Sequence, residues 1–295
     1  MKRLEDIVIP PLAAVSHDAG GANHIISWLQ DYNNKVRACM EGPAKIIWEN
    51  SFPNNKLLSI NEALENSKTL ISGTGAGDLE RFARIQANKR NIKNIAVIDH
   101  WTEYEKRFLH NGKELLPDLI LVGDEYAFNK ARNFFPSVTV INLPNSYLQK
   151  EAELCSSMRS REFLTPYENI LIIGEPYKNH SLDEQFRAIE FLMSNLIKIN
   201  LSKATVNITL RPHPSESIDK YSFLKKNYED LVTEFTITRN KELYKDIAWA
   251  DLVVGVNSFA LMISLTAGVP TMSILPPGQN KPELQHTNLI YLREK

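Results

Sequence analysis

The sequence predicts an α/β protein with two doubly wound domains, each a parallel sheet covered by helices. The chain has 295 residues, more than the roughly 100–200 residues of an ordinary domain. Short β-branched runs alternate with longer amphipathic stretches, which is typical of parallel strands joined by crossover helices. A polar segment without strand character, 149–167, interrupts this alternation. We therefore expect an N-terminal domain over 1–150 and a C-terminal domain over 168–295.

The composition excludes several classes of protein. Hydrophobic residues make up 43% and charged residues 23% of the chain, so a disordered or fibrous protein is excluded. The 34 basic and 35 acidic residues give a net charge of −1, so no overall positive field attracts nucleic acid. The spacing of Cys39 and Cys155 fits neither a disulfide framework nor a zinc site. Without a signal peptide or a bilayer-length apolar run, we expect a cytoplasmic protein with at most peripheral membrane contact.

The strands expected in each half follow from these apolar runs. In the first half they are Leu12–Val15, Ala44–Trp48, Thr69–Ser72, Asn94–Ile98, Leu119–Val122 and Thr139–Ile141. In the second half they are Ile170–Ile173, Val206–Leu210, Thr233–Thr238, Leu252–Val254 and Thr271–Ile274, with a helix over about Leu182–Ile199. Ligands of such sheets bind at the carboxyl ends of the strands. The loops that follow the strands, facing a cleft between the domains, are therefore the candidate sites.

The loop after the first strand carries ionisable groups beside paired glycines. Gly20 and Gly21 permit close approach of a ligand, and the helix that follows presents free N–H groups to an anion. Asp18 can remove a proton from a substrate hydroxyl, with His17 orienting it or taking that role itself. The alternative is structural, with the glycines serving helix packing and Asp18 capping the helix. The GxGxxG dinucleotide spacing is absent, which disfavours a nicotinamide enzyme.

Two further loops of the first half are candidates for lining the cleft. Gly73 and Thr74 belong to a glycine-rich turn that lacks the lysine of a Walker A loop. His100 and Trp101 follow the strand that ends at Ile98, where an aromatic ring suits stacking on a sugar or base. A ring that only plugs a domain interface is an equal alternative for Trp101.

In the second half, Arg211-Pro212-His213-Pro214 is the most specific local signal. The prolines restrict the backbone around His213, and the Arg211 guanidinium suits phosphate or carboxylate. Asn257 and Ser258 begin a later helix, where they can cap it or hold a phosphate. Glu175, after Gly174, either faces the ribose or base of a nucleotide or is a solvated turn carboxylate.

These motifs resemble GT-B glycosyltransferases, which have two facing Rossmann-like domains. The run from Asp251 to Ile274, with its Ala267-Gly268-Val269-Pro270 turn, is similar to their donor-binding domain. Arg211-Pro212-His213-Pro214 is similar to the His-Pro motif of bacterial sialyl-, polysialyl- and Kdo-transferases and of CDP-glycerol glycerophosphotransferases. The resemblance implies that His213 and Ser258 contact the nucleotide phosphate and that Asp18 is the acceptor-activating base.

The resemblance implies transfer of a sugar from a nucleotide donor, CMP-linked in preference to CDP- or UDP-linked, to a surface glycan or polysaccharide. The 1–150 domain is then the acceptor side and the 168–295 domain the donor side. No Asp-x-Asp occupies a suitable loop, so we expect no cofactor and no required metal, with protein cations neutralising the phosphates. Two alternatives remain: a nucleotide-sugar 2-epimerase or hydrolase of the same fold, and a non-catalytic nucleotide-sugar-binding subunit.

Overall fold

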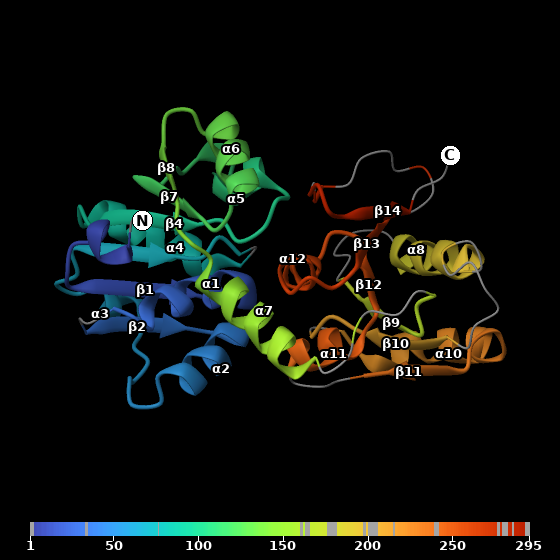
Figure 1. The fold of residues 1–295 in the computed structure, drawn as a ribbon. Coiled ribbons are helices and arrows are strands. Elements are labelled where there is room, and N and C mark those ends of the chain that lie inside the picture. The colour runs from blue at the N-terminus through green and yellow to red at the C-terminus, as the bar shows by residue number, and fades with distance from the viewer. Residues whose placement is uncertain are drawn as a thin grey trace. The chain divides into compact units, whose positions relative to one another are not determined.

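The computed structural model divides the chain into two compact units, Met1–Tyr147 and Leu148–Lys295, which we call unit 1 and unit 2 (Figure 1). The structure describes residues 3–32, 35–75, 77–159, 162, 166–175, 182–196, 199, 206–214, 216–238, 242–275, 278, 283–284 and 286–292. Helix α7, Ser146–Met158, includes the boundary between the units. No helix in these ranges is long and apolar enough to cross a membrane.

Unit 1 is a six-stranded parallel sheet in the order β2-β1-β3-β4-β7-β8. The strands are β1 Leu12–Ser16, β2 Val36–Met40, β3 Thr69–Ser72, β4 Lys93–Val97, β7 Leu119–Val122 and β8 Thr139–Asn142. The helices are α1 Ala19–Leu29, α2 Gly42–Ser51, α3 Ile60–Leu64, α4 Asp78–Lys89, α5 Tyr104–Phe108 and α6 Glu125–Phe134. A small hairpin, β5 Leu109–His110 and β6 Lys113–Glu114, follows α5.

Unit 2 is a second six-stranded parallel sheet in the order β11-β10-β9-β12-β13-β14, the strand order of dinucleotide-binding Rossmann folds. The strands are β9 Asn169–Ile173, β10 Asn207–Arg211, β11 Glu234–Ile237, β12 Leu252–Gly255, β13 Thr271–Ile274 and β14 Ile290–Leu292. The helices are α8 Leu182–Ser194, α10 Ser222–Tyr228, α11 Leu243–Trp249 and α12 Phe259–Thr266. The expected fold class, two doubly wound α/β domains, is confirmed.

The interior strands β1 and β9 are buried along their whole length. Both faces of a parallel sheet are covered by helices, so its strands are apolar runs instead of alternating patterns. Leu12 and Ile172, for example, have at most 1% of their surface exposed. Full burial of such a side chain stabilises the fold by about 1.5–3 kcal/mol, and these strands hold their carboxyl-terminal loops on a rigid support.

The strand expected at Ala44–Trp48 is wrong, because these residues lie inside α2. Pro43 occupies the first turn, where its fixed φ suits a helix. Ala44 and Trp48, four residues apart, are buried, whereas Ile46 between them is 63% exposed, which is helical periodicity. The edge position is taken by β2, which the sequence analysis missed, as it missed β14. The expected linker at 149–167 likewise begins inside α7.

Candidate functional sites at the carboxyl ends of the strands

Each sheet has one strand at which the order of strands reverses, so that the chain continues to the left of this strand in one part and to its right in the other. The candidate residues follow the carboxyl ends of this strand and its neighbours. In unit 1, β1 pairs with β2 on one side and with β3 on the other. In unit 2, β9 pairs with β10 and with β12. Loops diverge at such a switch point and leave room for a ligand. The predicted site residues therefore fall into two groups, one in each unit.

In unit 1, His17 and Asp18 form a hydrogen-bonded pair. His17 Nδ1 lies 2.8 Å from Asp18 Oδ1, and each side chain is 40% exposed. The hydrogen bond that His17 donates to Asp18 raises the pKa of His17 above its ordinary value. Asp18 is the N-cap residue of α1, but its side chain makes no capping hydrogen bond. The capping alternative therefore does not account for this carboxylate, which is partly exposed to solvent.

Glycines allow the ionisable side chains of this loop to approach the backbone. A Cβ atom at Gly75 would lie 2.3 Å from Asp18 Oδ2, and one at Gly42 would lie 2.7 Å from His17 Nε2. Gly42 also has a φ of +50°, which L side chains rarely adopt. Gly21 packs against the β3–α4 loop, because a Cβ at Gly21 would lie 3.1 Å from the Gly73 Cα. This contact agrees with the packing alternative given above for the paired glycines.

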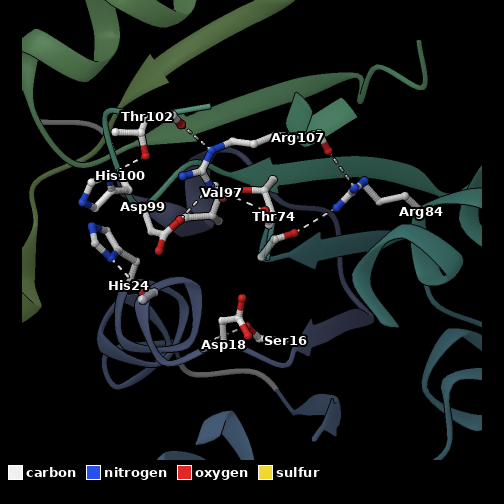
Figure 2. Close-up of polar contacts among 12 residues, drawn as sticks. Ser16, Asp18, His24, Thr74, Arg84, Val97, Asp99, His100, Thr102 and Arg107 are labelled. Carbon is white, nitrogen blue, oxygen red and sulfur yellow. Dashed lines mark hydrogen bonds and ion pairs between the residues drawn. The ribbon is translucent and has the colours of Figure 1, made fainter. Parts of the chain in front are cut away.

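A second carboxylate, Asp99, lies at the end of β4 beside Gly20 (Figure 2). Arg107 Nη1 donates to Asp99 Oδ1 at 2.9 Å and to Thr74 Oγ1 at 2.7 Å. Burial alone would raise the pKa of Asp99, but the charge of the Arg107 guanidinium is the largest opposing effect, its hydrogen bond adds to it, and the pKa lies below its usual value. Asp99 is therefore a fixed negative charge, and the sequence analysis noted its loop without singling it out.

His24, in α1, is a buried neutral histidine beneath this cluster. Its side chain is 3% exposed, and burial lowers its pKa. Asn145 Nδ2 lies 2.9 Å from His24 Nε2, and Gly20 O lies 3.1 Å from Nδ1. The Gly20 carbonyl can only accept, which assigns the proton to Nδ1, and Nε2 then accepts from the Asn145 NH2 group. His24 therefore connects the start of α1 to the loop after β8.

The other predicted residues of unit 1 are more enclosed than expected. Thr74 is buried and donates its hydroxyl to Val97 O at 2.8 Å, which fastens the β3–α4 loop to β4. Trp101 is 1% exposed and its indole donates to Asp124 at 3.1 Å, so neither ring face is open for stacking on a ligand. His100 lies 3.0 Å from the Thr102 hydroxyl and is half-buried.

In unit 2, Glu175 reaches the start of α12. Its Oε1 accepts hydrogen bonds from the backbone N–H groups of Val256, at 3.0 Å, and Asn257, at 2.6 Å, and the Ser258 N–H also stabilises the carboxylate. Burial nevertheless raises the pKa of Glu175 to about 7. A carboxyl group of the protein therefore lies at the helix N-terminus where a phosphate was predicted, and a solvated turn carboxylate is not what the structure contains.

Ser258 has the capping role expected of it, and Asn257 makes a contact that was not expected. The Ser258 hydroxyl caps α12 by accepting from the Ala260 N–H at 3.3 Å. The Asn257 side chain accepts from the backbone N–H groups of Glu283, at 3.0 Å, and Leu284, at 3.2 Å. Asn257 thereby holds the loop before β14. Glu283 and Leu284 are 26 and 27 residues from Asn257 in the sequence.

The Arg-Pro-His-Pro motif lies at the end of β10. Arg211 Nη1 lies 2.5 Å from Asp246 of α11, and the two side chains are 14% and 5% exposed. Gly174 fits against this segment, since its N–H donates to Arg211 O at 2.8 Å and a Cβ there would lie 3.1 Å from the Pro212 Cα. His213 is half-buried in the turn that follows. The Arg211 guanidinium is thus oriented by a buried carboxylate.

Glu80 and Arg107 are the charged residues that sequence reasoning missed most clearly in unit 1. Glu80 is 1% exposed and accepts the His17 N–H at 2.8 Å. The sequence indicates this buried role only weakly, because an acidic residue in the first turn of a helix is ordinarily exposed to solvent and interacts with the helix dipole. Within the described ranges, no group of three or more histidine, cysteine, aspartate or glutamate residues is arranged to hold a metal ion.

No model of a known protein family matches the chain, and no curated protein matches it in sequence. Solved structures match it in fold. A UDP-GlcNAc 2-epimerase from Neisseria meningitidis, solved with UDP-GlcNAc bound, matches with a TM-score of 0.55 and 10% identity, over 89% of this chain and 81% of that chain. An α/β-galactoside α-2,3-sialyltransferase from Photobacterium phosphoreum matches with a TM-score of 0.51 and 10% identity, over 95% of this chain and 98% of that chain.

At this identity the resemblance shows the fold and nothing finer. The expected resemblance is confirmed at this level: the chain has the fold of two Rossmann-like domains found in GT-B glycosyltransferases and in a nucleotide-sugar epimerase.

Proposed function

We propose that the protein is a GT-B glycosyltransferase that moves a sugar from a nucleotide donor, preferably CMP-linked, to a glycan acceptor without a metal ion. The observation that carries the proposal is the half-exposed His17–Asp18 pair, in which Asp18 makes no capping hydrogen bond. A carboxylate that is partnered by an imidazole and left open to a ligand suits general base catalysis. The fold it shares with a sialyltransferase supports the same reaction class.

In this proposal unit 1 supplies the base. Asp18 accepts the proton of the acceptor hydroxyl as that oxygen attacks the anomeric carbon of the donor sugar, and the bond from that carbon to the nucleotide phosphate oxygen breaks. His17 holds the Asp18 carboxylate in place through Nδ1. Gly20 and Gly21 keep the backbone close to the acceptor, beside the fixed charge of Asp99. Gly73 and His100 belong to the same set of loops.

Unit 2 binds the donor in this proposal. His213 and Arg211 stabilise the negative charge that develops on the leaving phosphate, which is the electrostatic part of catalysis. The N–H groups at the start of α12, from Asn257 and Ser258, take part as well. That these groups already hold the Glu175 carboxylate supports their use for an anion.

The first test is binding of CMP, CDP, UDP, GDP and ADP by calorimetry, with wild type and His213→Ala. Binding to the folded state raises its apparent stability, so thermal shifts provide a second readout. We expect CMP to bind and the variant to lose at least about tenfold in affinity, as follows when one hydrogen bond to a charged group is lost. Absence of binding by every nucleotide would refute the proposal.

The second test is turnover with the CMP sugars that the nucleotide result selects, CMP-sialic acid first. We expect Asp18→Asn to lower kcat by about 10²–10⁴-fold, the usual contribution of a general base, with little change in the Kd of CMP. The matched control is Asp31→Asn, which removes an exposed carboxylate at the other end of α1. Equal activity of the Asp18 and Asp31 variants would rule out Asp18 as the base.

A second candidate function is favoured by one observation, the match to an epimerase solved with UDP-GlcNAc. In a nucleotide-sugar epimerase or hydrolase, His17 and Asp18 would act on the donor itself or on water. Such an enzyme consumes its nucleotide sugar at full rate without an acceptor. A glycosyltransferase requires the acceptor, so donor consumption with and without a glycan separates the two functions. UDP-selective binding would also favour the epimerase.

A further inference from the structure

Glu80, in the first turn of α4, is a buried carboxylate behind the His17–Asp18 pair. It is 1% exposed, and its Oε1 accepts the backbone N–H of His17 at 2.8 Å. Its Oε2 is also buried and has no hydrogen-bond partner among the described residues. A carboxylate buried with one oxygen unsatisfied is costly for folding. Such a residue calls for an explanation beyond the stability of α4.

The contacts of Glu80 converge on the loop that carries the pair. The His17 backbone is held from both sides, because its N–H donates to Glu80 and its carbonyl accepts from the Ala44 N–H at 3.0 Å. Gly73 makes room for the carboxylate, since a Cβ there would lie 3.2 Å from Glu80 Oε1 and 2.9 Å from the Ser16 hydroxyl. The peptide between β1 and α1 is therefore fixed by Glu80.

The charge of Glu80 also acts on the imidazole. Three carboxylates face His17: Asp18 through its hydrogen bond, and Glu80 and Glu41 through their charges, all of which raise the pKa of His17. The groups around Glu80 are Asp18, Arg84 of the same helix, and the Cys39 thiol of β2, whose pKa burial and nearby acids raise to about 11. Burial raises the pKa of Glu80 itself.

We propose that Glu80 is a positioning residue for the His17–Asp18 pair, fixing the His17 peptide and supplying a buried negative charge behind the imidazole. Asp18 would make the contact with the acceptor, and Glu80 would act through His17. The catalytic part of this role rests on the proposed function. The effect of Glu80 on His17 does not, because that effect is a property of the protein without substrate.

The test is NMR titration of the His17 ring in wild type and in Glu80→Gln, which keeps an oxygen to accept the His17 N–H but removes the charge. We expect the pKa of His17 to fall by about 0.5 pH unit or more in the variant. The removed charge is screened by an effective dielectric constant of about 20 or above, which still leaves an effect of this size on a nearby group. The matched control is Asp78→Asn in the same turn of α4, an 83% exposed carboxylate paired with Arg81. It should leave the His17 titration unchanged.

A titration of His17 that is the same in Glu80→Gln and in Asp78→Asn would overturn the inference. If Glu80→Gln does not fold, the wild-type protein still decides. Carbonyl-carbon NMR of the Glu80 side chain should then give a pKa above the ordinary glutamate value, and the His17 amide proton should shift with the same midpoint. A Glu80 carboxyl with an ordinary pKa and no response of the His17 amide would equally overturn it.

A catalytic readout follows once a donor and an acceptor are known. We expect Glu80→Gln to lower kcat about tenfold and to move the pH profile of kcat, while the KM for the donor stays within about twofold, because a positioning residue of unit 1 acts on the chemical step. A changed His17 pKa in a protein that binds no nucleotide would leave the positioning role intact and refute only the proposed function. An unchanged His17 pKa in an active transferase would refute the positioning role and leave the proposed function intact.

Discussion

The Glu175 carboxylate accepts a hydrogen bond from the Asn257 backbone N–H at 2.6 Å, immediately before α12. A negative charge at this position is favoured by the unpaired N–H groups and the dipole of the helix. Burial opposes it and raises the pKa of Glu175 to about 7. The residue therefore changes its protonation state near neutral pH, at the place where the nucleotide phosphate is proposed to bind.

This relationship makes stability depend on pH through Glu175. Between its ordinary pKa of 4.5 and about 7, the folded protein keeps a proton that the unfolded chain has released. Stability therefore falls as pH rises through this window and levels off above it. We expect Glu175→Gln to lack this loss of stability, which amounts to at most about 3 kcal/mol for a pKa raised from 4.5 to about 7. Urea unfolding of both proteins from pH 4.5 to 8 measures it, and parallel curves would contradict the expectation.

Nucleotide binding should also respond to Glu175. A phosphate and the Glu175 carboxylate would compete for the same N–H groups of Asn257 and Ser258, and a neutral glutamine competes less. We expect Glu175→Gln to bind CMP about tenfold more tightly at pH 8, where the wild-type carboxylate is ionised, and the difference to shrink at pH 6. Calorimetry at the two pH values tests this. Weaker binding by the variant would show instead that Glu175 contacts the nucleotide.

The His17–Asp18 pair should stabilise the fold on the acid side. The hydrogen bond that His17 donates to Asp18 raises the pKa of His17 above 6.5. The contribution of the pair to stability is therefore present below that value and is lost as pH rises through the pKa of the folded state. We expect Asp18→Asn to lower the His17 pKa and to destabilise the protein more at pH 6 than at pH 8.5. The ring protons of His17 and urea unfolding report the two effects. Equal destabilisation at both pH values would argue against the pairing.

Gly20 should not tolerate a side chain, for a reason that differs from helix propensity. A Cβ there would lie 1.9 Å from Asp99 Oδ2, so Asp99 or the start of α1 has to move. We expect Gly20→Ala to cost about 1–3 kcal/mol, as for overpacking. Gly77→Ala is the control, since a Cβ there meets no atom within 4 Å. Combination with Asp99→Ala should relieve much of the cost, and additive effects in this cycle would refute the clash.

Arg159 and Asp251 form a buried ion pair in unit 2. Their nitrogen and oxygen lie 3.1 Å apart, and the side chains are 9% and 0% exposed. We expect Arg159→Ala to destabilise the protein by about 3–5 kcal/mol, because it leaves Asp251 buried without its cation. Arg81→Ala breaks the exposed pair with Asp78 and should cost about 0–1 kcal/mol. Chemical unfolding compares the two, and similar losses would show that Asp251 finds another partner.

Much of the fold could be predicted because parallel strands have a strong local signature. The runs that become β1, β3, β7, β9 and β13 are buried at every residue. His17 and Asn257 follow the ends of β1 and β12, and Arg211 is the last residue of β10. The short edge strand β14 has exposed or half-buried residues and was missed. The Ala44–Trp48 segment is apolar apart from Lys45, and Pro43 in the first turn and the helical spacing of its buried residues distinguish it from a strand.

The candidate site could be predicted in part. Asp18 beside glycines and an arginine before a proline-flanked histidine are visible as residue types in loops. Their partners are not, since Glu80 comes from α4 and is 63 residues from His17, and Arg211 meets Asp246 across 35 residues. The enclosure of Trp101 could not be read from its sequence either, because it depends on Asp124, 23 residues away.

The sequence by itself determined the class of fold and the positions of the polar loops, because the periodicity of apolar residues and the special backbone residues act locally. Only the tertiary structure decided which charges are buried, which carboxylate occupies the start of α12, and which side chains fix His17 and Asp18. Those outcomes depend on desolvation and on hydrogen bonds between residues far apart in the chain. Neither is set until the sheets have formed.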